Sequence, residues 1–478
     1  MKKDELLERA INYYRHGYKV AEIARICNVS RMTIHRWVKD TGAKRDDYQR
    51  YKDAREKKIR EEAEKLGWKN YLYKLSGGYT SYEDGIFRLH NKDDEKGFVV
   101  SGSDTIAVIR GSVVRKDSWL DIVSSLEKHG VCVANSRKTI NICTDKYRTA
   151  LKLADYGIRQ PKTVLITDPE NSVKAFDILD TKFPVIMKTL RGSKGVGVLF
   201  IESEKSMDSI VQILHKQDED TDLLLQEYIK TDYDVRVHVL GGKVFAAMMR
   251  PVVEGDFRSN VSQGSEPKKI KLTELEIEES LKAAKAVGGL WTAVDFIPAK
   301  NREKEPPFVI EVNSSPGTEG IEEATGQNIS KEIIEFFADS KNWVKVPSEC
   351  GYKEVVTIKP FGQIVAKFDT GNSGMPVIHA DEMKVSGKKV TWSLLDKTIT
   401  SDIIRTEEIS VGGLRDYDED RYVVKLDVEF LGTVYETEFT LDDRDERSHI
   451  LFDRAFMNRL NVMVNPGSKY VVTTKYSL

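Results

Sequence analysis

The stretch that decides the fold is TAVDFIPAKNREKEPPFVIEVNSSPGTEGIEEATGQNIS, residues 292–330. It contains two short apolar runs, AVDFI with Asp295 and FVIEVN with Glu311 and Asn313. Positions two apart on a strand point to the same face, so Glu311 and Asn313 share a face that Asp295 on a neighbouring strand can join. Two carboxylates and an amide oxygen suit Mg²⁺ or Mn²⁺ held mostly through substrate phosphates. The alternative is a strand end whose acidic residues face water.

A glycine-containing segment lies upstream, at residues 183–201 (FPVIMKTLRGSKGVGVLFI), and predicts a strand, a loop and a strand. Lys188 ends the first apolar run, and the loop after it contains Gly192, Gly195 and Gly197. Glycines let backbone N–H groups approach phosphate oxygens, and a lysine adds a point charge. The segment is not a P-loop, because it lacks the GxxxxGK[ST] pattern. Taken alone, such a loop is a weak signal for phosphate binding.

The next apolar run, LLLQEYIK at residues 223–230, breaks into Gln226, Glu227, Tyr228 and Ile229. A hinge of this kind can hydrogen-bond an adenine edge through its backbone and hold a ribose through a carboxylate. We therefore expect these four residues to bind a nucleotide.

Two further segments follow in a consistent order. Residues 233–251 (YDVRVHVLGGKVFAAMMRP) predict a hairpin that turns at its Gly-Gly pair, with Asp234 and Arg236 on one face. Residues 254–264 (EGDFRSNVSQG) predict a polar loop that carries Arg258.

In this order the motifs resemble the ATP-grasp superfamily, and more closely its RimK-type branch, the ligases that add glutamate to the C-terminus of a ribosomal protein. The resemblance covers roughly residues 100 to 335 and includes DKYRTALKLADYGIRQPKT at residues 145–163. It implies that Lys146 and Lys188 contact phosphates, and that Asp295, Glu311 and Asn313 bind the metals.

The same resemblance, together with the motifs above, gives the expected nucleotide site. Adenosine would lie against Glu227 and Tyr228, with Asp234 near the ribose and phosphate path, and Arg258 would act as a catalytic residue. The full expected set of nucleotide-binding residues is Lys146, Lys188, Gly195, Gln226, Glu227, Tyr228, Ile229, Asp234, Arg236, Arg258, Ser259 and Asn260.

The activity that the resemblance implies is that of an ATP-dependent carboxylate–amine ligase using ATP with Mg²⁺ or Mn²⁺. It would add a glutamate-like amino acid to a peptide or protein carboxylate through an acylphosphate, with Lys188 and Arg258 stabilising the developing charge. One departure concerns VSQGSEP at residues 261–267, where the family has a basic, glycine-rich stretch resembling LHRGG. The identity of the acid and of the amine, and the length of the product, therefore stay open.

Composition places the chain among soluble globular proteins. It has 478 residues, 40% hydrophobic and 31% charged, and a net charge of −2, which gives no global field that would attract nucleic acid. The cysteines Cys27, Cys132, Cys143 and Cys350 show no metal spacing, which predicts a reduced chain in the cytoplasm. No apolar run reaches 18 residues and the N-terminus has no signal-peptide core, so we expect no membrane partner.

The N-terminal residues predict a small helical unit. Within residues 1–45 there are eleven Lys or Arg and five Asp or Glu, and Ser30 is a suitable N-cap for the helix that follows. The segment resembles a helix-turn-helix of the resolvase or homeodomain-like kind. DNA or RNA is therefore an expected partner, through Arg31, Thr33, His35, Arg36 and Lys39. A three-helix module that contacts protein is the alternative.

The C-terminal part changes to short alternating strands, which is typical of an all-β domain. After an apolar strand comes Asp369-Thr370-Gly371, the pattern of an aspartic-protease turn, and His379 follows ten residues later. The region resembles one half of a retropepsin and the ATP-dependent zinc protease family, which implies a catalytic Asp369. It departs from that family in DTGNSG and in Asp453 before Arg454. A single half has one such aspartate, so peptide cleavage would require a homo-oligomer. The alternatives are a binding or dimerisation module, or a metal site that uses His379.

We therefore expect a multidomain α+β protein with a helix-turn-helix, a central ATP-grasp fold and an all-β, retropepsin-like barrel. The main activity expected is the ligase. The alternatives are a peptide-cleaving enzyme of the aspartic-protease type, or a nucleic-acid-binding regulator with a degenerate ATP-grasp domain. The expected boundaries are 1–43 for the helix-turn-helix, 44–66 for a charged, solvated helical linker, 67–145 for the lobe before the ATP-grasp domain, 146–345 for that domain and 355–478 for the β domain.

Overall fold

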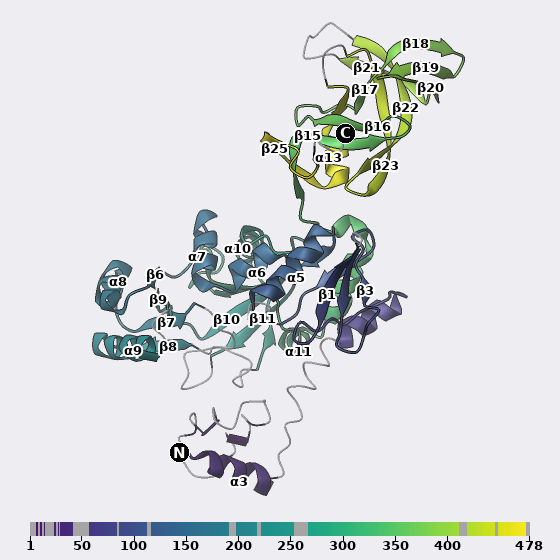
Figure 1. Cartoon of the computed structure of the whole chain (residues 1–478). Helices are drawn as coiled ribbons and strands as arrows, with labels where there is room; N and C mark the ends of the chain where they lie inside the picture. Colours follow the sequence, from purple (N-terminus) through teal and green to yellow (C-terminus); the bar gives the residue numbers. More distant parts are fainter. Residues whose placement is uncertain are drawn as a thin grey trace. The chain divides into compact units, whose positions relative to one another are not determined.

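The computed structural model divides the chain into two units, Met1–Val344 and Lys345–Leu478, each described by itself (Figure 1). No helix in the described part of the chain combines the length and the hydrophobicity needed to cross a lipid bilayer. The structure describes scattered positions between 6 and 27, and then residues 29–41, 57–83, 86–111, 116–190, 197–217, 221–252, 266–410, 418–444 and 448–474.

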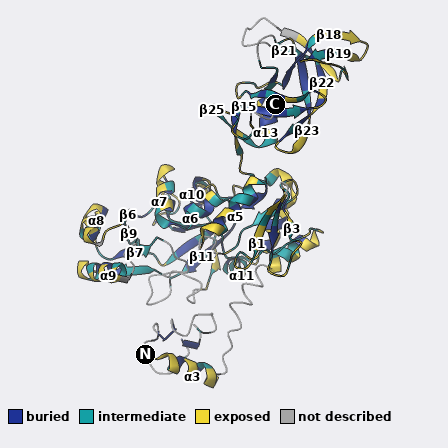
Figure 2. Ribbon diagram, viewed as in Figure 1, coloured by how far each residue is buried: buried dark blue, intermediate teal, exposed yellow. Residues whose placement is uncertain are grey.

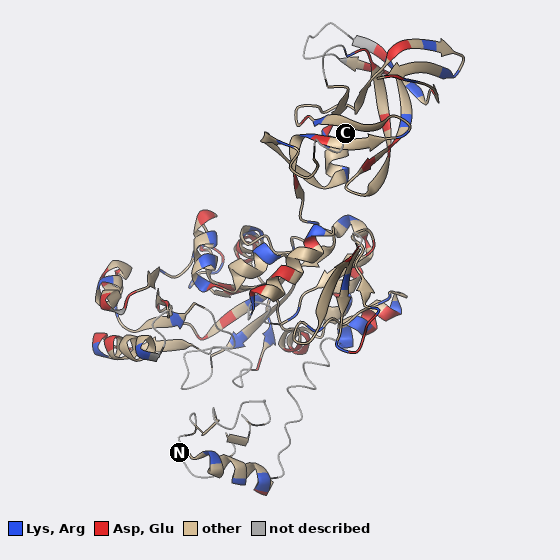
Figure 3. Ribbon diagram, in the orientation of Figure 1, with Lys and Arg blue, Asp and Glu red and all other residues tan. Residues whose placement is uncertain are grey.

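The N-terminal helix α3 (Arg31–Thr41) is amphipathic. Its buried side chains Ile34 and Trp37 pack with Ile23 and Cys27 from the preceding residues. Ser30 caps the helix, because its Oγ accepts the Thr33 N–H at 3.1 Å, as the sequence predicted. Its exposed residues include Arg31, Arg36 and Lys39, and lysines and arginines are blue in Figure 3.

Residues 57–65 are helical and contact the rest of the first unit. Lys58 Nζ lies 2.7 Å from Glu322 Oε2, and Asn328 Nδ2 donates to Glu62 Oε1 at 3.0 Å. Lys58 and Glu62 share one helix face because they are four residues apart. The described part of the charged linker is therefore seated on the segment that follows the expected metal ligands, rather than fully solvated.

A small lobe follows. Its antiparallel sheet consists of β1 (Tyr79–Glu83), β2 (Ile86–His90) and β3 (Phe98–Val99), and a parallel pair joins β4 (Ile106–Val108) to β5 (Cys132–Ala134). The helices of this part are α5 (Asp117–Lys128), α6 (Arg137–Cys143) and α7 (Lys146–Asp155). Leu120, Val123 and Leu126 of α5 form its core with Phe87 and Val133.

A four-stranded antiparallel sheet comes next, in the order β6-β9-β7-β8. Helices α8 (Ser172–Leu179) and α9 (Glu204–Gln217) pack on it, and Leu179, Met187, Val211 and Leu225 lie in their shared core. A short 3₁₀ turn, η2 (Pro169–Asn171), precedes α8. The strands are β6 (Thr163–Ile166), β7 (Val185–Thr189), β8 (Val198–Ile201) and β9 (Leu223–Glu227).

The central sheet has five antiparallel strands in the order β12-β11-β10-β13-β14, and its two faces differ. One face carries Val235, Val237 and Val294, which pack against Ala283 of α10 (Glu274–Ala286), and the other carries charged residues such as Arg236 and Asp295. Most residues of this sheet are buried or partly buried, dark blue and teal in Figure 2. The strands are β10 (Tyr233–Leu240), β11 (Lys243–Pro251), β12 (Lys268–Lys269), β13 (Trp291–Ile297) and β14 (Phe308–Asn313). The unit ends with α11 (Glu319–Thr325), α12 (Ile329–Ala338) and η4 (Ser340–Asn342).

The second unit is built mainly of strands, as the sequence predicted. A large sheet has the order β21-β22-β23-β17-β24-β16-β15-β25, and a further pairing of β22 with β15 makes it curl back on itself. The bounds are β15 (Ser348–Ile358), β16 (Gly362–Phe368), β17 (Val377–His379), β21 (Arg405–Ser410), β22 (Asp418–Phe430), β23 (Thr433–Asp442), β24 (Ile450–Phe452) and β25 (Val462–Lys469).

The core of the second unit is aromatic. Phe368, Trp392, Phe452 and Phe456 are almost fully buried in it, the last from the single described helix of this unit, α13 (Arg454–Leu460). A separate three-stranded sheet joins β18 (Asp381–Ser386), β19 (Lys389–Leu394) and β20 (Lys397–Asp402).

Candidate active site

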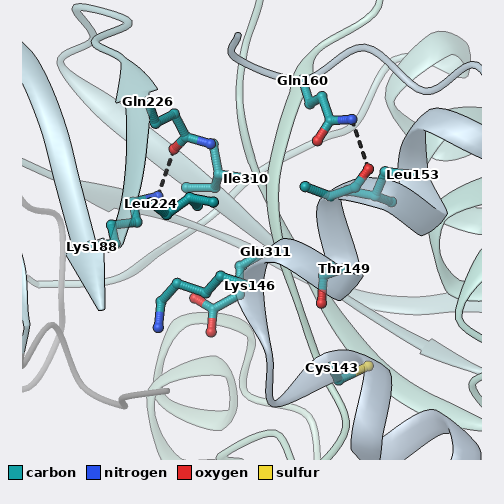
Figure 4. A pocket seen from close by; sticks show the side chains of 11 residues that line it. Cys143, Lys146, Thr149, Leu153, Gln160, Lys188, Leu224, Gln226, Ile310 and Glu311 are labelled. Atoms are coloured by element: carbon teal, nitrogen blue, oxygen red, sulfur yellow. Dashed lines mark hydrogen bonds between the residues drawn. The ribbon is translucent and has the colours of Figure 1, made fainter. Parts of the chain in front are cut away.

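A pocket lies where the four-stranded sheet, the central sheet and α7 meet. Figure 4 shows charged and polar side chains from all three around it. They include Lys146 from α7, Lys188 from β7 and Glu311 from β14. The residues that line the pocket are Cys143, Lys146, Thr149, Ala150, Leu153, Gln160, Lys188, Leu224, Gln226, Ile310 and Glu311.

Lys146 is placed by the start of α7. The Asp145 carboxylate caps this helix by accepting the N–H groups of Tyr147 and Arg148, each at 3.0 Å. Lys146 Nζ donates to the Thr189 carbonyl oxygen at 3.1 Å. Burial lowers the pKa of Lys146, and the negative charges of Glu311 and Asp145 act in the opposite direction.

Lys188 is held by Gln226. Its Nζ donates to Gln226 Oε1 at 2.6 Å, and the two side chains project toward each other from neighbouring strands (Figure 4). Loss of hydration lowers the pKa of Lys188 to about 8, while Glu311 raises it and Lys146 lowers it further. Lys188 therefore carries its charge at neutral pH and loses it in mildly alkaline solution.

The three expected metal ligands lie on one face of the central sheet. Strands β13 and β14 pair Asp295 with Glu311 and Ala293 with Asn313. A β-bulge between Asp295 and Phe296 inserts Ile310, so that Ile310 and Glu311 both line the pocket although they are adjacent in sequence. The bulge thus turns Glu311 toward Asp295.

Two arginines lie on the same face. Arg236 donates to Asp295 Oδ1 and Oδ2 at 2.7 and 2.6 Å. Arg250 donates to both oxygens of Asp234 at 2.7 Å and lies 3.1 Å from Asp295. Burial alone would raise the pKa of Asp295, but the two guanidinium groups lower it overall.

Arg250 did not emerge from the sequence. It is only 3% exposed, and the hairpin register pairs it with Asp234. The alternation of Ala246, Met248 and Arg250 along the strand was the sequence signal that could have placed Arg250 on the same face as Asp234. It was hidden because a bulge at His238 shifts the register of the hairpin by one residue. Counting back from the Gly-Gly turn would have placed another residue opposite Asp234.

The metal-binding chemistry fits these residues. Glu311 has no ion-pair or side-chain hydrogen-bond partner among the described residues, and the buried Nδ2 of Asn313 has none either. Both side chains therefore remain available on the pocket side, and their oxygens are of the type that Mg²⁺ prefers. The Asp295 carboxylate already contacts Arg236 and Arg250, so a metal ion bound to it would lie close to these two guanidinium groups.

The expected hinge residues follow one another at the end of β9. The Glu227 backbone N–H donates to the Lys162 carbonyl at 2.9 Å, and the ring of Tyr228 meets Phe200 edge-on, with centroids 5.1 Å apart. Ile229 is partly buried, and the side chain of Gln226 points to Lys188. The hinge therefore lies beside the pocket, because its first residue, Gln226, is one of the lining residues.

The remaining predicted residues of the nucleotide and acyl site are Gly195, Arg258, Ser259 and Asn260, and they lie outside the described residues. Of the loop glycines, Gly197 is described. Its φ is +82°, and an added Cβ would collide with Thr189 Oγ1, so a side chain would be strained there.

In the second unit, Asp369 lies in a tight turn after β16. Its Oδ1 accepts the Gly371 N–H at 3.0 Å, and Lys367 Nζ lies 3.0 Å from its Oδ2. Burial raises the pKa of Asp369, but Lys367 and the Gly371 N–H lower it, and the net shift is downward. The Arg454 N–H donates to the Asn372 carbonyl at 3.0 Å, which ties the turn to the start of α13.

His379 lies beside Asp381 and Asp443, and their potential ligand atoms are within 4.8 Å of one another. The ring nitrogens are both engaged, however. Nδ1 accepts the Arg444 N–H at 2.9 Å, which places the ring proton on Nε2, and Nε2 lies 3.0 Å from Asp381 Oδ2. Both ring nitrogens therefore have protein partners in this arrangement, and a cation bound by His379 would have to replace one of them.

Comparison with protein families gives two matches along the chain. Residues 143–337 match the RimK-like ATP-grasp domain, and residues 5–45 match a homeodomain-like domain. The first match contains the whole pocket and the three expected metal ligands.

Two relatives, each called a probable alpha-L-glutamate ligase, are similar to this chain. The one from Psychromonas ingrahamii is 38% identical over 217 residues, which are 45% of this chain and 70% of the relative. The one from Coxiella burnetii is 37% identical over 229 residues, which are 48% and 74% of the two chains.

Among solved structures, the ATP-grasp ligase PsnB complexed with a minimal precursor is 19% identical and covers 60% of this chain and 95% of its own, with a TM-score of 0.47. D-alanine–D-alanine ligase from Bacillus anthracis is 23% identical and covers 46% of this chain and 74% of its own, with a TM-score of 0.38.

The pocket between two antiparallel sheets and the family match define an ATP-grasp ligase, which depends on ATP with Mg²⁺. The chain belongs to the RimK-like ATP-grasp family. It is an ATP-dependent carboxylate–amine ligase, and a homeodomain-like helix-turn-helix precedes its ligase domain.

Proposed function

We propose that this ligase adds a glutamate-like amino acid to a peptide or protein carboxylate through an acylphosphate. The observation that carries the proposal is the position of Glu311, Asp295 and Asn313 on one sheet face, beside a pocket that also holds Lys146 and Lys188. The similarity to relatives called alpha-L-glutamate ligases supports glutamate as the amino acid.

The proposed roles of the residues follow from their charges. When bound, ATP would supply the phosphoryl group that activates a carboxylate for attack by an amine, and Mg²⁺ would offset the negative charge of the phosphates. Glu311, Asn313 and Asp295 would hold the metal through oxygen atoms. Lys146 and Lys188 would hold phosphates by their positive charges, and the hinge from Gln226 to Ile229 would hold the adenosine, with Asp234 near the ribose and phosphate path.

Arg236 would stabilise negative charge beside the metal ligands. Its guanidinium already binds Asp295 with both Nε–H and Nη–H, which fixes its direction on the pocket side of the sheet. Arg250 is buried and would act by holding Asp234 and Asp295 in place. For Arg258, with Ser259 and Asn260, we keep the proposal that they line the nucleotide and acyl site and that Arg258 is catalytic.

The experiment that tests this function measures ADP release by the full chain with a panel of single amino acids and acidic peptides, with products identified by mass spectrometry. The expected result is ADP release that requires both a carboxylate acceptor and an amino acid, and a product heavier by one glutamate residue. Glu311→Gln is the matched control for contaminating ATPases. Release of ADP without any amide product would contradict the proposal.

For the helix-turn-helix we propose binding to DNA or RNA. The supporting observation is that Arg31, Arg36 and Lys39 are exposed on α3, opposite its buried Ile34 and Trp37. Cations gathered on the outer face of such a helix can neutralise phosphates.

For the second unit we propose, as a second activity, peptide cleavage by paired Asp369 carboxylates in a homodimer. The supporting observation is the tight turn in which the Gly371 N–H orients Asp369 and the Asn372 carbonyl joins α13. The bond that the ligase makes, or the tail that it modifies, is the proposed substrate.

A further inference from the structure

Three hydrogen bonds lead away from the pocket, from Lys188 to Pro161. Lys188 Nζ donates to Gln226 Oε1 at 2.6 Å, and Gln226 Nε2 donates to Thr163 Oγ1 at 2.9 Å. Thr163 Oγ1 in turn donates to the Pro161 carbonyl oxygen at 2.8 Å. Thr163 does not line the pocket itself, and its hydroxyl is connected to the pocket through the side chain of Gln226.

The chemistry at the two ends fixes the direction of this chain of hydrogen bonds. A carbonyl oxygen can only accept, so the Thr163 hydroxyl points its proton at Pro161 and offers a lone pair to Gln226. An ammonium group can only donate, so Lys188 requires the oxygen of the Gln226 amide. Both ends therefore demand the same orientation of the amide, with its NH₂ toward Thr163 and its oxygen toward Lys188.

The sheet explains why these side chains meet. Strand β9 lies between β6 and β7, and Gln226 is paired with Thr163 on one side and with Ile186 on the other. Lys188 is two residues beyond Ile186 and is therefore the diagonal neighbour of Gln226. Gln226 is buried, at 6% exposure, so water competes little for its amide.

We propose that Thr163 is a positioning residue for the ligase, which acts through Gln226 to hold the Lys188 ammonium group where nucleotide phosphates bind. The inference rests on the proposed role of Lys188. Without the Thr163 hydroxyl, the amide of Gln226 is free to rotate and to present its NH₂ to the ammonium group. That orientation loses a charge-assisted hydrogen bond and places two donors face to face.

Other charges also face Lys188, and they set the background for the test. Glu311 on β14 favours the charged form, and Lys146 on α7 disfavours it. Neither is changed by a substitution at Thr163. A shift in the titration of Lys188 on substitution of Thr163 would therefore report on the Gln226 amide.

The substitutions to compare are Thr163→Val, which removes the hydroxyl at nearly constant volume, and Thr163→Ser, which keeps it. Thr292→Val is the matched control, because Thr292 is a fully buried strand threonine of the same unit whose Oγ1 has no hydrogen-bond partner among the described residues. Gln226→Glu adds a carboxylate beside Lys188 and should move its titration in the opposite direction.

Two measurements in the full chain apply to each variant. The first is the NMR titration of the Lys188 side chain in lysine-labelled protein without nucleotide, assigned with Lys188→Arg. The second is the affinity for AMP-PNP with Mg²⁺ by calorimetry between pH 7 and 9. Thr163→Val is expected to lower the pKa of Lys188 and to weaken AMP-PNP binding about five- to ten-fold at pH 8, as for loss of a hydrogen bond to a charged group. Thr163→Ser and Thr292→Val are expected to match the wild type.

A purely structural role for Thr163 would lower the melting temperature without moving the titration of Lys188, and that result would overturn the proposal. Unchanged AMP-PNP affinity in Thr163→Val, alongside a clear loss in Lys188→Met, would overturn it as well. Unchanged affinity in Lys188→Met would instead remove Lys188 from the phosphate site, and the proposal for Thr163 with it.

Discussion

Arg236 donates two parallel hydrogen bonds to the Asp295 carboxylate, from its Nε–H and Nη–H, at 2.7 and 2.6 Å. Arg250 approaches the same carboxylate at 3.1 Å. Glu311, on the adjacent strand, has no such partner among the described side chains. The two proposed metal ligands therefore differ, because Asp295 also neutralises buried arginine while Glu311 does not.

This difference predicts unequal effects of two similar substitutions. Asp295→Asn and Glu311→Gln should both abolish ADP formation, since each removes a proposed metal ligand. Asp295→Asn should also lower the free energy of unfolding by roughly 3–5 kcal/mol, because it removes one partner of a buried ion pair. Glu311→Gln should change it by less than about 1 kcal/mol. Urea denaturation and an ADP assay measure the two effects separately.

Full turnover by either variant at ordinary Mg²⁺ would show that the ligand is wrongly chosen. Equal stability of the two variants would show that the arginine–aspartate network contributes little to folding.

The lowered pKa of Lys188 predicts two opposite pH dependences. Between pH 8 and the ordinary lysine value of 10.5, the unfolded chain holds a proton that the folded chain has released. The stability of the nucleotide-free protein should therefore gain a contribution that rises with pH in this window, and Lys188→Met should remove it. ATP affinity should fall as the pH passes about 8, because the charge is lost.

At pH 7, Lys188→Met should weaken ATP binding by about ten-fold or more, as expected for a lost hydrogen bond to a charged group. Calorimetry measures the affinity, and Lys182→Met, at an exposed position of the same unit, is the matched control. An affinity for ATP that does not change with pH between 7 and 9.5 would contradict the assignment of Lys188.

A large effect on stability is expected from a substitution of Glu354 in the second unit. This carboxylate is fully buried and accepts backbone N–H groups from Gly351, Val471 and Thr473 at 2.6, 2.8 and 3.1 Å. Glu354→Gln replaces one accepting oxygen with an NH₂ group that faces donors, so the free energy of unfolding should fall by about 2–3 kcal/mol. Glu349→Gln, at an exposed position of the same strand, should have almost no effect.

For Glu354→Gln, thermal denaturation of the full chain provides the measurement, with ADP formation as the second readout. Loss of ligase activity at a temperature where the first unit is still folded would show that the effect of Glu354→Gln is not confined to the second unit.

The helix-turn-helix predicts weak, salt-dependent binding to nucleic acid. Replacing Arg31, Arg36 and Lys39 by alanine should weaken binding at low salt and reduce the slope of log K against log salt by up to about 3, one for each lost phosphate contact. Gel-shift titrations at several salt concentrations measure this slope. Ligase activity should stay unchanged, because these residues lie outside the pocket.

The control for charge alone is the alanine replacement of three exposed lysines outside α3, namely Lys57, Lys69 and Lys92. Equal losses in both triple variants would indicate unspecific attraction. Absence of binding to any DNA or RNA by the wild type would favour a protein-contact module.

The proposed role of Asp369 predicts that peptide cleavage depends on dimer formation. If two Asp369 carboxylates act together, peptide cleavage should require a dimer and should vanish in Asp369→Asn, whereas the exposed Asp396→Asn should behave as the wild type. Light scattering of the full chain and a peptide cleavage assay measure the two properties. A strictly monomeric chain would exclude pairwise aspartate catalysis and leave a binding module.

The sequence predicted the parts of the ligase domain that depend on local pattern. The alternation in residues 233–251 and its Gly-Gly turn indicated the hairpin that is observed, and the i, i+2 spacing indicated that Glu311 and Asn313 share a face. These features follow from the two-residue period of a strand, which needs no knowledge of the rest of the fold.

What the sequence did not predict depends on register and on distant partners. Arg250 was missed because a one-residue bulge at His238 shifts the hairpin pairing. The helix at 57–65 was expected to be solvated, and its contacts with Glu322 and Asn328 join segments more than 260 residues apart. The hydrogen bonds that occupy His379 likewise come from distant residues, such as the Arg444 N–H. No local pattern contains such information.

The bulge at Ile310 also determines where the chain can tolerate a change of length. In a regular strand that continues from Val309, Glu311 would face α10 and the apolar core. The extra residue Ile310 shifts the alternation of side chains by one position, so that Glu311 faces the pocket instead. Residues 303–305, in the exposed turn before β14, could be shortened without disturbing that alternation. Deletion of Ile310 would reverse the alternation. The Glu311 carboxylate would then point into the apolar core, and the pocket would lose its acidic side chain.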